Sequence, residues 1–547
     1  MIASGLSEFL TISAIIPFLF ALNNPETIGQ IPYIRNLLLS FNLITVKETI
    51  TFITLFFILA SLFSGFLRTI NFWLSGKISA LIGSDLSIKA YDIKLNDSYE
   101  KHVKQNSSEF LNLIVTCVNR AILSIYCFSQ IITSLLIGIF IISALLIINW
   151  KAVLISFLLI LICYLIFAFT IKKRMFNNSK KIITSSRIQI QIMQEGLGSV
   201  KDIILSGNYK PFYDEFIKAD LVYRKLNAEN KFLTVIPKYV VESLGISLIA
   251  FLGYLFLITG VNKELFIPLL GSLALGAQRL LPVTQQIYSN WSLLIGFKPD
   301  LCELLDVVEQ KKNSEKYYFK PYNLKESIKF ENIAYNYGKK DKAISNINLN
   351  IKAGETIGLI GRTGSGKSTT VDVLMGLLKP SKGKVLIDNK DLYQENQFLI
   401  NWRRSIAHVP QSIYLSDNTF LMNIAFGVPL EKIDFNTVKI AAKEALISSF
   451  IESTSSGYRT KVGEYGVRLS GGQRQRIGIA RAIYRLYTSK INLLVLDEST
   501  SSLDKFTESK IIKVFEEKKN LTKIIISHNL ETLSSCNRII DISQDFR

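Results

Sequence analysis

The stretch ETIGLIGRTGSGKSTTVDVLMGLL, residues 355–378, decides how the second half of the chain folds. A strand-like apolar run leads into the glycine-rich segment GRTGSGKST at 361–369, and a helix-like run follows. A phosphate-binding loop has this order, because it connects a buried strand to the N-terminus of a helix. The stretch therefore predicts an α/β domain with a nucleotide site, whereas a chance glycine-rich turn would lack the flanking elements.

The residues of this loop have distinct expected roles. Glycines let successive backbone N–H groups turn toward phosphate oxygens, and a lysine places a cation on the terminal phosphates. A serine hydroxyl can ligate Mg²⁺. The predicted nucleotide contacts are Gly361, Arg362, Thr363, Gly364, Ser365, Gly366, Lys367, Ser368 and Thr369, with Ser368 also predicted to bind the metal.

A second motif, LLVLDE at 493–498, is an apolar strand that ends in two carboxylates. We expect Asp497 to hold Mg²⁺ and Glu498 to act as the general base for the attacking water. Alone, such a strand is also ordinary sheet sequence, but beside a phosphate loop it indicates nucleotide hydrolysis. Apolar runs alternate with helical stretches around it and predict a mostly parallel sheet: 328–337, 347–360, 367–378, 384–388, 405–411, 474–488, 491–497 and 523–527.

The first half of the chain is far more apolar, and hydrophobic residues make up 49% of the whole sequence. A membrane-spanning helix needs roughly 20 mostly apolar residues. Six segments meet this requirement: 1–22, 48–75, 121–149, 152–171, 239–259 and 264–295. The sequence therefore predicts an all-α six-helix membrane domain over 1–310, a polar linker at 300–325 and the α/β nucleotide domain over 326–547.

Two polar continuations, 76–120 and 172–238, keep a helical pattern beyond membrane depth. We expect these helices to turn near 96–108 and 207–214, where Asn, Ser, Gly and Pro accumulate. Such turns are the expected docking points for the nucleotide domain. The first span already begins at Met1, so we expect its opening half to be missing.

The formal net charge is +19, from 63 Lys and Arg against 44 Asp and Glu. Nucleic acid or a membrane with basic cytoplasmic loops would explain this balance, and the long apolar segments favour the membrane. Basic clusters at 171–181 and 218–238 contrast with sparsely charged outer loops at 23–47, 149–152 and 260–264. The nucleotide domain is therefore predicted to be cytoplasmic, with no nucleic-acid partner.

Between the two motifs lies LSGGQRQR at 469–476, which resembles the signature loop of the ATP-binding-cassette (ABC) family. The resemblance covers the whole nucleotide domain in order. It implies that Tyr337 stacks on adenine, that Gln411 senses the γ-phosphate and Mg²⁺, and that His528 contacts the γ-phosphate. The implied catalytic residues are Glu498, His528 and Gln411, and the further implied nucleotide contacts are Ser470, Gly471, Gly472, Gln473 and Asp504.

In this family one cassette's phosphate loop faces the signature loop of another. The resemblance therefore implies a homodimer that binds two ATP, with Lys367 of one subunit opposite Ser470 of its twin. TKVGEYG at 460–466 resembles a motif of the family's exporters, as does the fusion of both domains in one chain. An ATPase that drives export is the expected activity.

Three cations in or near the predicted spans, Arg68, Lys238 and Arg279, are costly there and so point to a binding site for an anion. Snorkelling to the interface or internal ion pairing, for example of Lys238 with Glu242, is the alternative. The membrane half is similar to bacterial flippases of polyprenyl-pyrophosphate-linked oligosaccharides, through segments 7–19 and 99–110 and RLLP at 279–282.

We therefore expect a flippase of a lipid-linked anionic glycan in the bacterial plasma membrane. A lipid, drug or peptide exporter and a membrane-tethered regulatory ATPase are the alternatives.

Overall fold

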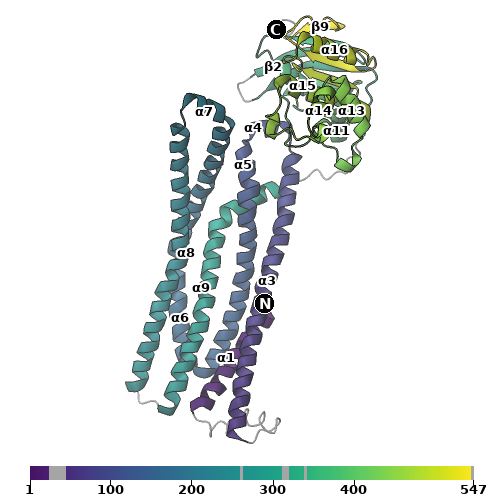
Figure 1. Ribbon diagram of the computed structural model, residues 1–547. Helices are drawn as coiled ribbons and strands as arrows, with labels where there is room; N and C mark the ends of the chain where they lie inside the picture. The colour runs from purple at the N-terminus through teal and green to yellow at the C-terminus, as the bar shows by residue number, and fades with distance from the viewer. Residues whose placement is uncertain (24–44, 259–262, 311–319, 338–341, 544–547) are drawn as a thin grey trace. The chain divides into compact units, whose positions relative to one another are not determined.

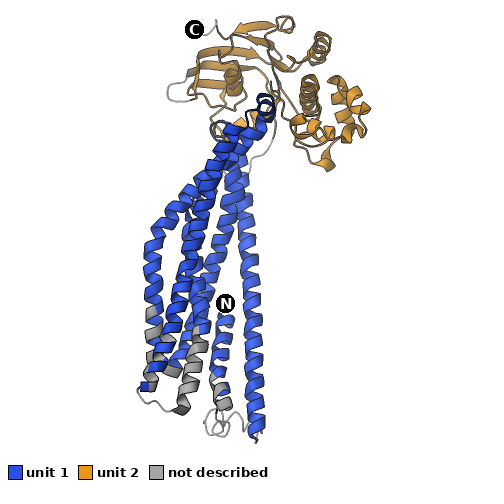
Figure 2. Ribbon diagram, turned by 60° about the vertical axis from the view of Figure 1, so that its left-hand side comes forward, with its two compact units in different colours: residues 1–97, 102–313 blue, residues 98–101, 314–547 orange. Residues whose placement is uncertain are grey.

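The computed structural model describes residues 1–23, 45–258, 263–310, 320–337 and 342–543. The chain divides into two compact units, coloured separately in Figure 2. We call residues 1–97 with 102–313 the helical unit, and residues 98–101 with 314–547 the sheet unit.

The helical unit is built from long helices that run side by side (Figure 1). Their bounds are α1 Ile2–Asn23, α3 Val46–Leu95, α5 Ser107–Asn112, a π-helical turn η2 Leu113–Cys117, α6 Val118–Gly198, α7 Val200–Ser206, α8 Lys210–Ile258 and α9 Lys263–Val308. The short helix α4, Tyr99–Lys104, has residues in both units.

Helix α6 has 81 residues without an assigned break, although a loop was predicted at 149–152. A straight helix would separate Asn112 from Ser186 by about 110 Å. Instead, the Ser186 hydroxyl donates to the Asn112 side chain at 3.1 Å. The chain therefore reverses direction within α6, as the two predicted spans require, while the backbone stays helical around the predicted loop.

Two helices among the described residues, Val46–Leu95 and Ser107–Ile147, are long and apolar enough to cross a membrane. Large apolar side chains of α3, such as Leu62 and Phe66, are exposed, as expected of a surface that faces lipid. The predicted spans at 152–171, 239–259 and 264–295 lie in part among residues whose side chains are outside the description. The length and composition of these two helices agree with a membrane protein.

The predicted turns near 96–108 and 207–214 are confirmed as helix breaks. Helix α3 ends at Leu95, and Asn96 caps it with a backbone N–H to the Asp92 carbonyl. Helix α7 ends at Ser206, where Gly207 has a φ of 65° in the left-handed region. Glycine reaches that conformation at little cost, which explains why the helix stops there.

The sheet unit contains two sheets. A four-stranded antiparallel sheet has the order β2-β1-β4-β5, and a five-stranded parallel sheet has the order β6-β7-β8-β3-β9. The strands are β1 Ser327–Asn336, β2 Lys342–Lys352, β3 Thr356–Ile360, β4 Lys382–Ile387, β5 Lys390–Asp391, β6 Ile406–Val409, β7 Leu493–Asp497, β8 Thr522–Ile526 and β9 Arg538–Asp541. The predicted parallel sheet is confirmed.

Helices cover these sheets and complete two apolar cores. One core joins α13, α15 and α16 to β6–β8, and the other joins α10 and α11 to both sheets. The helices and 3₁₀ turns of the unit are α10 Lys367–Leu374, α11 Asn396–Arg404, α12 Phe420–Ile424, η3 Leu430–Lys432, α13 Phe435–Glu444, α14 Ser448–Ser453, η4 Gly457–Arg459, η5 Glu464–Gly466, α15 Gly471–Thr488 and α16 Lys505–Glu516. The predicted fold class, a helical domain followed by an α/β nucleotide domain, is confirmed.

Candidate nucleotide site

The parallel sheet explains why motifs far apart in the sequence meet. The carboxyl ends of parallel strands lie at one edge of a sheet, and ligands of α/β folds bind at that edge. Strand β3 ends at the phosphate loop, β6 leads to Gln411, β7 ends at Asp497 and β8 leads to His528. The predicted catalytic residues therefore share one edge.

The phosphate loop has the backbone that its glycines permit. Gly361, Gly364 and Gly366 have φ values of 151°, 82° and 93°. Gly366 is also the N-cap of α10, and a Cβ there would lie 2.4 Å from the Ile344 side chain and 2.7 Å from the Ala343 carbonyl oxygen. Any larger residue at 366 would thus clash with β2 and displace the loop.

Polar groups of the loop are positioned for an anion. The Lys367 ammonium is largely buried and donates to the Gly361 carbonyl at 2.6 Å. The Ser365 hydroxyl is buried and meets no hydrogen-bond partner among the described residues. An unsatisfied buried hydroxyl is costly, and a phosphate oxygen would satisfy it. The loop therefore fits nucleotide phosphates.

The remaining residues of the predicted loop differ in exposure. Arg362, Thr363 and Ser368 are exposed, whereas Thr369 is buried in α10. The Thr369 hydroxyl lies 3.2 Å from the Tyr337 hydroxyl. The Tyr337 ring packs edge-on against Tyr335 with 5.1 Å between centroids and stays 40% exposed. The hydroxyl contact with Thr369 holds the Tyr337 ring beside the phosphate loop. The exposed part of the ring is therefore available to stack on a nucleobase.

Glu498 is the centre of a three-residue cluster. Its Oε2 accepts a hydrogen bond from the Gln411 amide at 2.7 Å, and its Oε1 lies 3.0 Å from His528 Nε2. Its φ of 45° is unusual for a side chain with a Cβ, and its backbone N–H donates to the Ile526 carbonyl at 3.0 Å. Strained backbone of this kind persists where the surroundings hold it, often in active sites.

Asp497 is the neighbouring carboxyl at the end of β7. Burial raises its pKa, and the nearby Glu498 carboxylate raises it further, while the Lys367 ammonium opposes both. The ammonium of the phosphate loop and the carboxyl of β7 thus act on each other electrostatically. A cation placed between Asp497 and nucleotide phosphates would remove the cost of burying this carboxyl.

The donor atoms fit Mg²⁺. Ser368, Gln411 and Asp497 offer hydroxyl, amide and carboxylate oxygens, the ligands that Mg²⁺ prefers. In the described part of the chain, no three His, Cys, Asp or Glu side chains gather to hold a metal unaided. Mg²⁺ is commonly held by one or two carboxylates together with substrate phosphates.

The signature segment forms the start of α15. Ser470 is its N-cap, and a capping box joins Ser470 and Gln473 through bonds of 3.3 and 2.9 Å. The free N–H groups of the first helical turn, which include Gly471 and Gly472, make such an end favourable for an anion. The structure therefore presents these residues at a helix N-terminus suited to phosphate.

Asp504 caps α16 by accepting the Thr507 N–H at 2.9 Å, and this backbone bond lowers its pKa. The segment before it is held by Gln475 of α15, which donates to the Ser501 hydroxyl at 3.2 Å and accepts the Ser502 N–H at 3.0 Å. Sequence reasoning assigned no role to Gln475, although it lies within the segment LSGGQRQR, two residues after Gln473. It links the signature helix to the loop that ends at Asp504.

Two further polar residues were not predicted. Glu508 accepts the hydroxyls of Thr500 and Thr532, each at 2.7 Å, and so joins the segments that follow β7 and β8. Burial and the Asp497 charge raise the pKa of Asp372, on α10, to about 6. Its only sequence signal is a carboxyl inside the apolar run VDVL.

The three predicted substrate cations separate into two groups in the helical unit. Arg68 and Arg279 both approach Glu8, at 2.8 and 3.6 Å. Lys238 is exposed, and its ammonium lies 5.9 Å from the centroid of the adjacent Tyr239 ring. Among the described residues it forms no ion pair with Glu242. The structure thus brings together two of the three.

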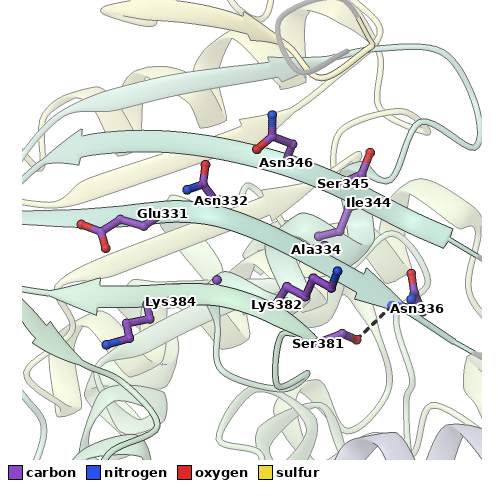
Figure 3. Close-up of a pocket in the computed structure, with 11 residues that line it drawn as sticks. Glu331, Asn332, Ala334, Asn336, Ile344, Ser345, Asn346, Ser381, Lys382 and Lys384 are labelled. Atoms are coloured by element: carbon purple, nitrogen blue, oxygen red, sulfur yellow. Dashed lines mark hydrogen bonds between the residues drawn. The ribbon is translucent and has the colours of Figure 1, made fainter.

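A groove of about 650 Å³ lies on the antiparallel sheet (Figure 3). Its lining comes from β1, β2 and β4 and includes Glu331, Asn346 and Lys382, with the Ser381 hydroxyl accepting the Asn336 N–H at 3.3 Å. None of the predicted nucleotide residues lines it.

Comparison with known proteins agrees with this site. The sequence model described as ABC transporter matches residues 344–501. An ATP-dependent lipid A-core flippase of Chromohalobacter salexigens is 36% identical over 265 residues, which cover 48% of this chain and 44% of that protein. The ATP-dependent lipid A-core flippase of Haemophilus influenzae is 36% identical over 244 residues, which cover 44% of this chain and 40% of that protein. The matched region thus spans less than half of these two relatives.

Longer matches extend into the helical unit. The lipid A-core flippase of Alcanivorax borkumensis is 31% identical over 403 residues, covering 72% of this chain and 67% of that protein. A solved structure described as a bacterial Atm1-family ABC exporter with ATP bound has a TM-score of 0.79, with 20% identity, and covers 98% of this chain and 92% of its own. The fold is therefore that of an ABC exporter, and the chain belongs to the ABC transporter family.

Proposed function

We propose that the chain is an ATP-driven exporter that works as a homodimer and moves an anionic lipid across the bacterial plasma membrane. The observation that carries the ATPase activity is the cluster of Gln411, Glu498 and His528 at the edge that also holds the phosphate loop. The cluster combines a carboxylate with an amide and an imidazole that orient it.

Each residue has a chemical role in hydrolysis. Glu498 accepts a proton from the attacking water, Gln411 fixes the carboxylate through its amide, and His528 contacts the terminal phosphate. Lys367 and the loop N–H groups hold the phosphates, and Tyr337 offers its ring to adenine. Mg²⁺ held by Ser368, Gln411 and Asp497 would supply charge stabilisation for the leaving phosphate.

The homodimer follows from the family's arrangement, in which Ser470, Gly471, Gly472 and Gln473 complete the site of a second copy, with Asp504 beside them. This predicts complementation between defective subunits. Lys367→Ala and Ser470→Ala subunits, each inactive alone, would together form one intact site and one doubly defective site.

Complementation is measured by phosphate release from purified, differently tagged mixed dimers. Restored hydrolysis relative to either parent supports sites shared between subunits. Activity that stays at the parental level, or a strictly monomeric protein with full ATPase activity, contradicts the homodimer.

Phosphate or pyrophosphate on a lipid is the substrate chemistry that we propose. Arginine binds such groups through paired N–H donors, and Arg68 and Arg279 converge in the helical unit. The relatives named lipid A-core flippases support a lipid substrate. The likeness of the membrane half to oligosaccharide flippases favours a lipid-linked anionic glycan. A drug or peptide exporter remains the second candidate within transport, supported by the shared exporter fold.

Reconstituted protein in nanodiscs distinguishes these substrates. We expect polyprenyl-pyrophosphate-linked glycans to stimulate ATP hydrolysis more than lipid A-core or uncharged polyprenol. Stimulation by lipid A-core alone would reassign the lipid, and equal activity with all of them would reject an anionic lipid. Hydrolysis without transport of any of them would favour a regulatory ATPase.

We propose that the helical unit crosses the membrane several times and that the nucleotide domain lies in the cytoplasm. In intact cells this predicts protection of the sheet unit from added protease, and in inside-out vesicles it predicts cleavage. Cleavage in intact cells would reverse the orientation.

A further inference from the structure

The helical unit buries a carboxylate that the proposed mechanism does not use. Glu8 of α1 has a side chain that is 1% exposed, and it lies between Arg68 of α3 and Arg279 of α9. The Ser64 hydroxyl also donates to it, at 2.9 Å. A buried ionisable group inside a membrane domain is costly and points to function.

The two hydrogen bonds and the longer ion-pair contact around Glu8 all fall on one of its two oxygens. Arg68 Nη1, Ser64 Oγ and Arg279 Nη1 all approach Oε1, at 2.8, 2.9 and 3.6 Å. The other oxygen, Oε2, is buried and meets no donor among the described residues. A carboxylate can accept two parallel hydrogen bonds from one guanidinium, one on each oxygen. Glu8 contacts both arginines through one oxygen only, so half of its capacity to accept hydrogen bonds is unused.

The two guanidinium groups have donors to spare. Each arginine carries five N–H groups, and Glu8 is the only acidic partner of either one within the described residues. Both side chains are 38% exposed, whereas Glu8 is enclosed. The cluster of two cations and one anion keeps a net positive charge, and the donors that remain free suit an anion with more oxygens than a carboxylate.

Helix α1 carries this carboxylate on a buried polar face. Ser4 and Thr11 lie one turn before and after Glu8, and their hydroxyls reach the Leu67 and Ala60 carbonyls of α3 at 3.4 and 3.3 Å. These bonds are long, so the ion pairs of Glu8 are the strongest polar link between α1 and its neighbours in this region.

We propose that Glu8 is an internal counter-ion, which occupies Arg68 and Arg279 until the phosphate group of the substrate replaces it. This inference rests on the proposed function, since it takes the substrate to be anionic. A phosphate or pyrophosphate first meets the N–H donors that Glu8 leaves free, and its further oxygens then compete with Glu8 for the donors that it holds. A carboxylate that loses its cations cannot stay buried without cost, so substrate binding loosens α1 from α3 and α9.

The test measures equilibrium binding to the full-length chain in detergent. The probes are a short-chain polyprenyl pyrophosphate, inorganic pyrophosphate and the uncharged polyprenol. All proteins carry Lys367→Ala, so that the phosphate loop does not contribute. We expect Glu8→Gln to tighten polyprenyl pyrophosphate binding about tenfold, because removing an internal competitor raises the binding-competent fraction, and to leave polyprenol binding unchanged.

Other variants separate charge from packing. Glu8→Asp withdraws the charge by one methylene, so its affinity for polyprenyl pyrophosphate should lie between those of wild type and Glu8→Gln. This variant also provides the test if Glu8→Gln does not fold. Ser64→Ala keeps all three charges and should change affinity less than Glu8→Gln. Unchanged or weaker binding by Glu8→Gln and Glu8→Asp overturns the counter-ion role.

The source of the anion and the underlying function have their own readouts. If Glu8→Gln tightens the binding of polyprenyl pyrophosphate alone, the anion is a lipid head group. If it tightens the binding of inorganic pyrophosphate alone, the lipid source of the anion is overturned. If Arg279→Ala weakens binding while Glu8→Gln changes nothing, only the counter-ion role fails. If Arg68→Ala and Arg279→Ala also leave binding unchanged, the anionic substrate itself is rejected.

Discussion

Two glutamates, Glu498 and Glu8, show how different surroundings give one side chain opposite uses. Glu498 lies at the edge of a parallel sheet, where an amide and an imidazole orient it. Glu8 is enclosed in a helical bundle, where two guanidinium groups neutralise it. A base needs partners that position it yet leave it able to accept a proton, whereas a counter-ion needs partners that hold its charge.

The largest effect is expected at Glu498. Glu498→Gln keeps the shape and the Gln411 contact but cannot accept a proton, so ATP hydrolysis should fall about 10³-fold. ATP binding should persist, because the phosphate loop is untouched. Phosphate release and nucleotide binding measure the two effects, with the exposed Glu452→Gln as the matched control. Near-normal turnover would show that Glu498 is not the base.

Within the helical unit, Arg279→Ala should lower transport by a larger factor than it lowers ATP hydrolysis. The reason is that the role proposed for Arg279 is contact with the substrate, and Arg279 lies in a separate unit from the residues proposed to hydrolyse ATP. Transport into vesicles and phosphate release are compared in the same preparation, and about tenfold loss of transport is expected for one charge-assisted contact. Equal loss of both activities would indicate a folding defect.

Lys238→Gln is the control that sharpens this result. Lys238 is exposed and stands outside the Glu8 cluster, so its loss should change transport much less. A Lys238→Gln defect as large as that of Arg279→Ala would mean that the substrate binds elsewhere.

A smaller effect is expected at Gln475, which holds the loop before Asp504. Gln475→Met removes both bonds and leaves the Ser502 N–H without its acceptor, at a cost of about 1–3 kcal/mol. We expect a several-fold fall in ATP hydrolysis, with a smaller effect than Glu498→Gln. Gln394→Met, at an exposed position, is the control. A loss equal to that of Glu498→Gln would place Gln475 in the chemistry itself.

Sequence reasoning succeeded where short motifs follow strands. The parallel order of β6, β7, β8 and β3 brings Gln411, Glu498, His528 and the phosphate loop to one edge, so finding each motif was enough to predict the group. Gln475 and Glu508 were missed because each joins segments that are distant in the sequence, with partners 26 and 24 residues away, and no motif names them. Their role depends on loop packing, which the sequence pattern does not specify.

The helical unit was harder to predict for a different reason. Helical periodicity indicates which face of a helix is buried, but not which helix it meets. Arg68 and Arg279 were predicted to line a site, yet nothing in the sequence paired either of them with Glu8. Lys238 was grouped with them by charge alone, and its exposure separates it.

The smallest effect concerns His408, which contrasts with His528 in the same unit. Burial in β6 lowers the pKa of His408 to about 4 from an ordinary 6.5, and its Nε2 is buried without a described partner. The folded state thus favours the neutral ring, so this contribution to stability is complete above pH 6.5 and is lost as the pH falls toward 4.

His408→Phe removes the titration while keeping a ring. At pH 5.5 it should stabilise the fold relative to wild type by about 1 kcal/mol, which corresponds to a few degrees in Tm. At pH 7.5 the two proteins should differ less, since neither ring is charged. Thermal unfolding of the full chain in detergent at both pH values measures this. Because His408 lies within a strand while His528 follows one and is exposed, ATP hydrolysis should depend on His528 and hardly on His408. A pH-independent stability difference would mean that packing rather than protonation distinguishes the two side chains at position 408.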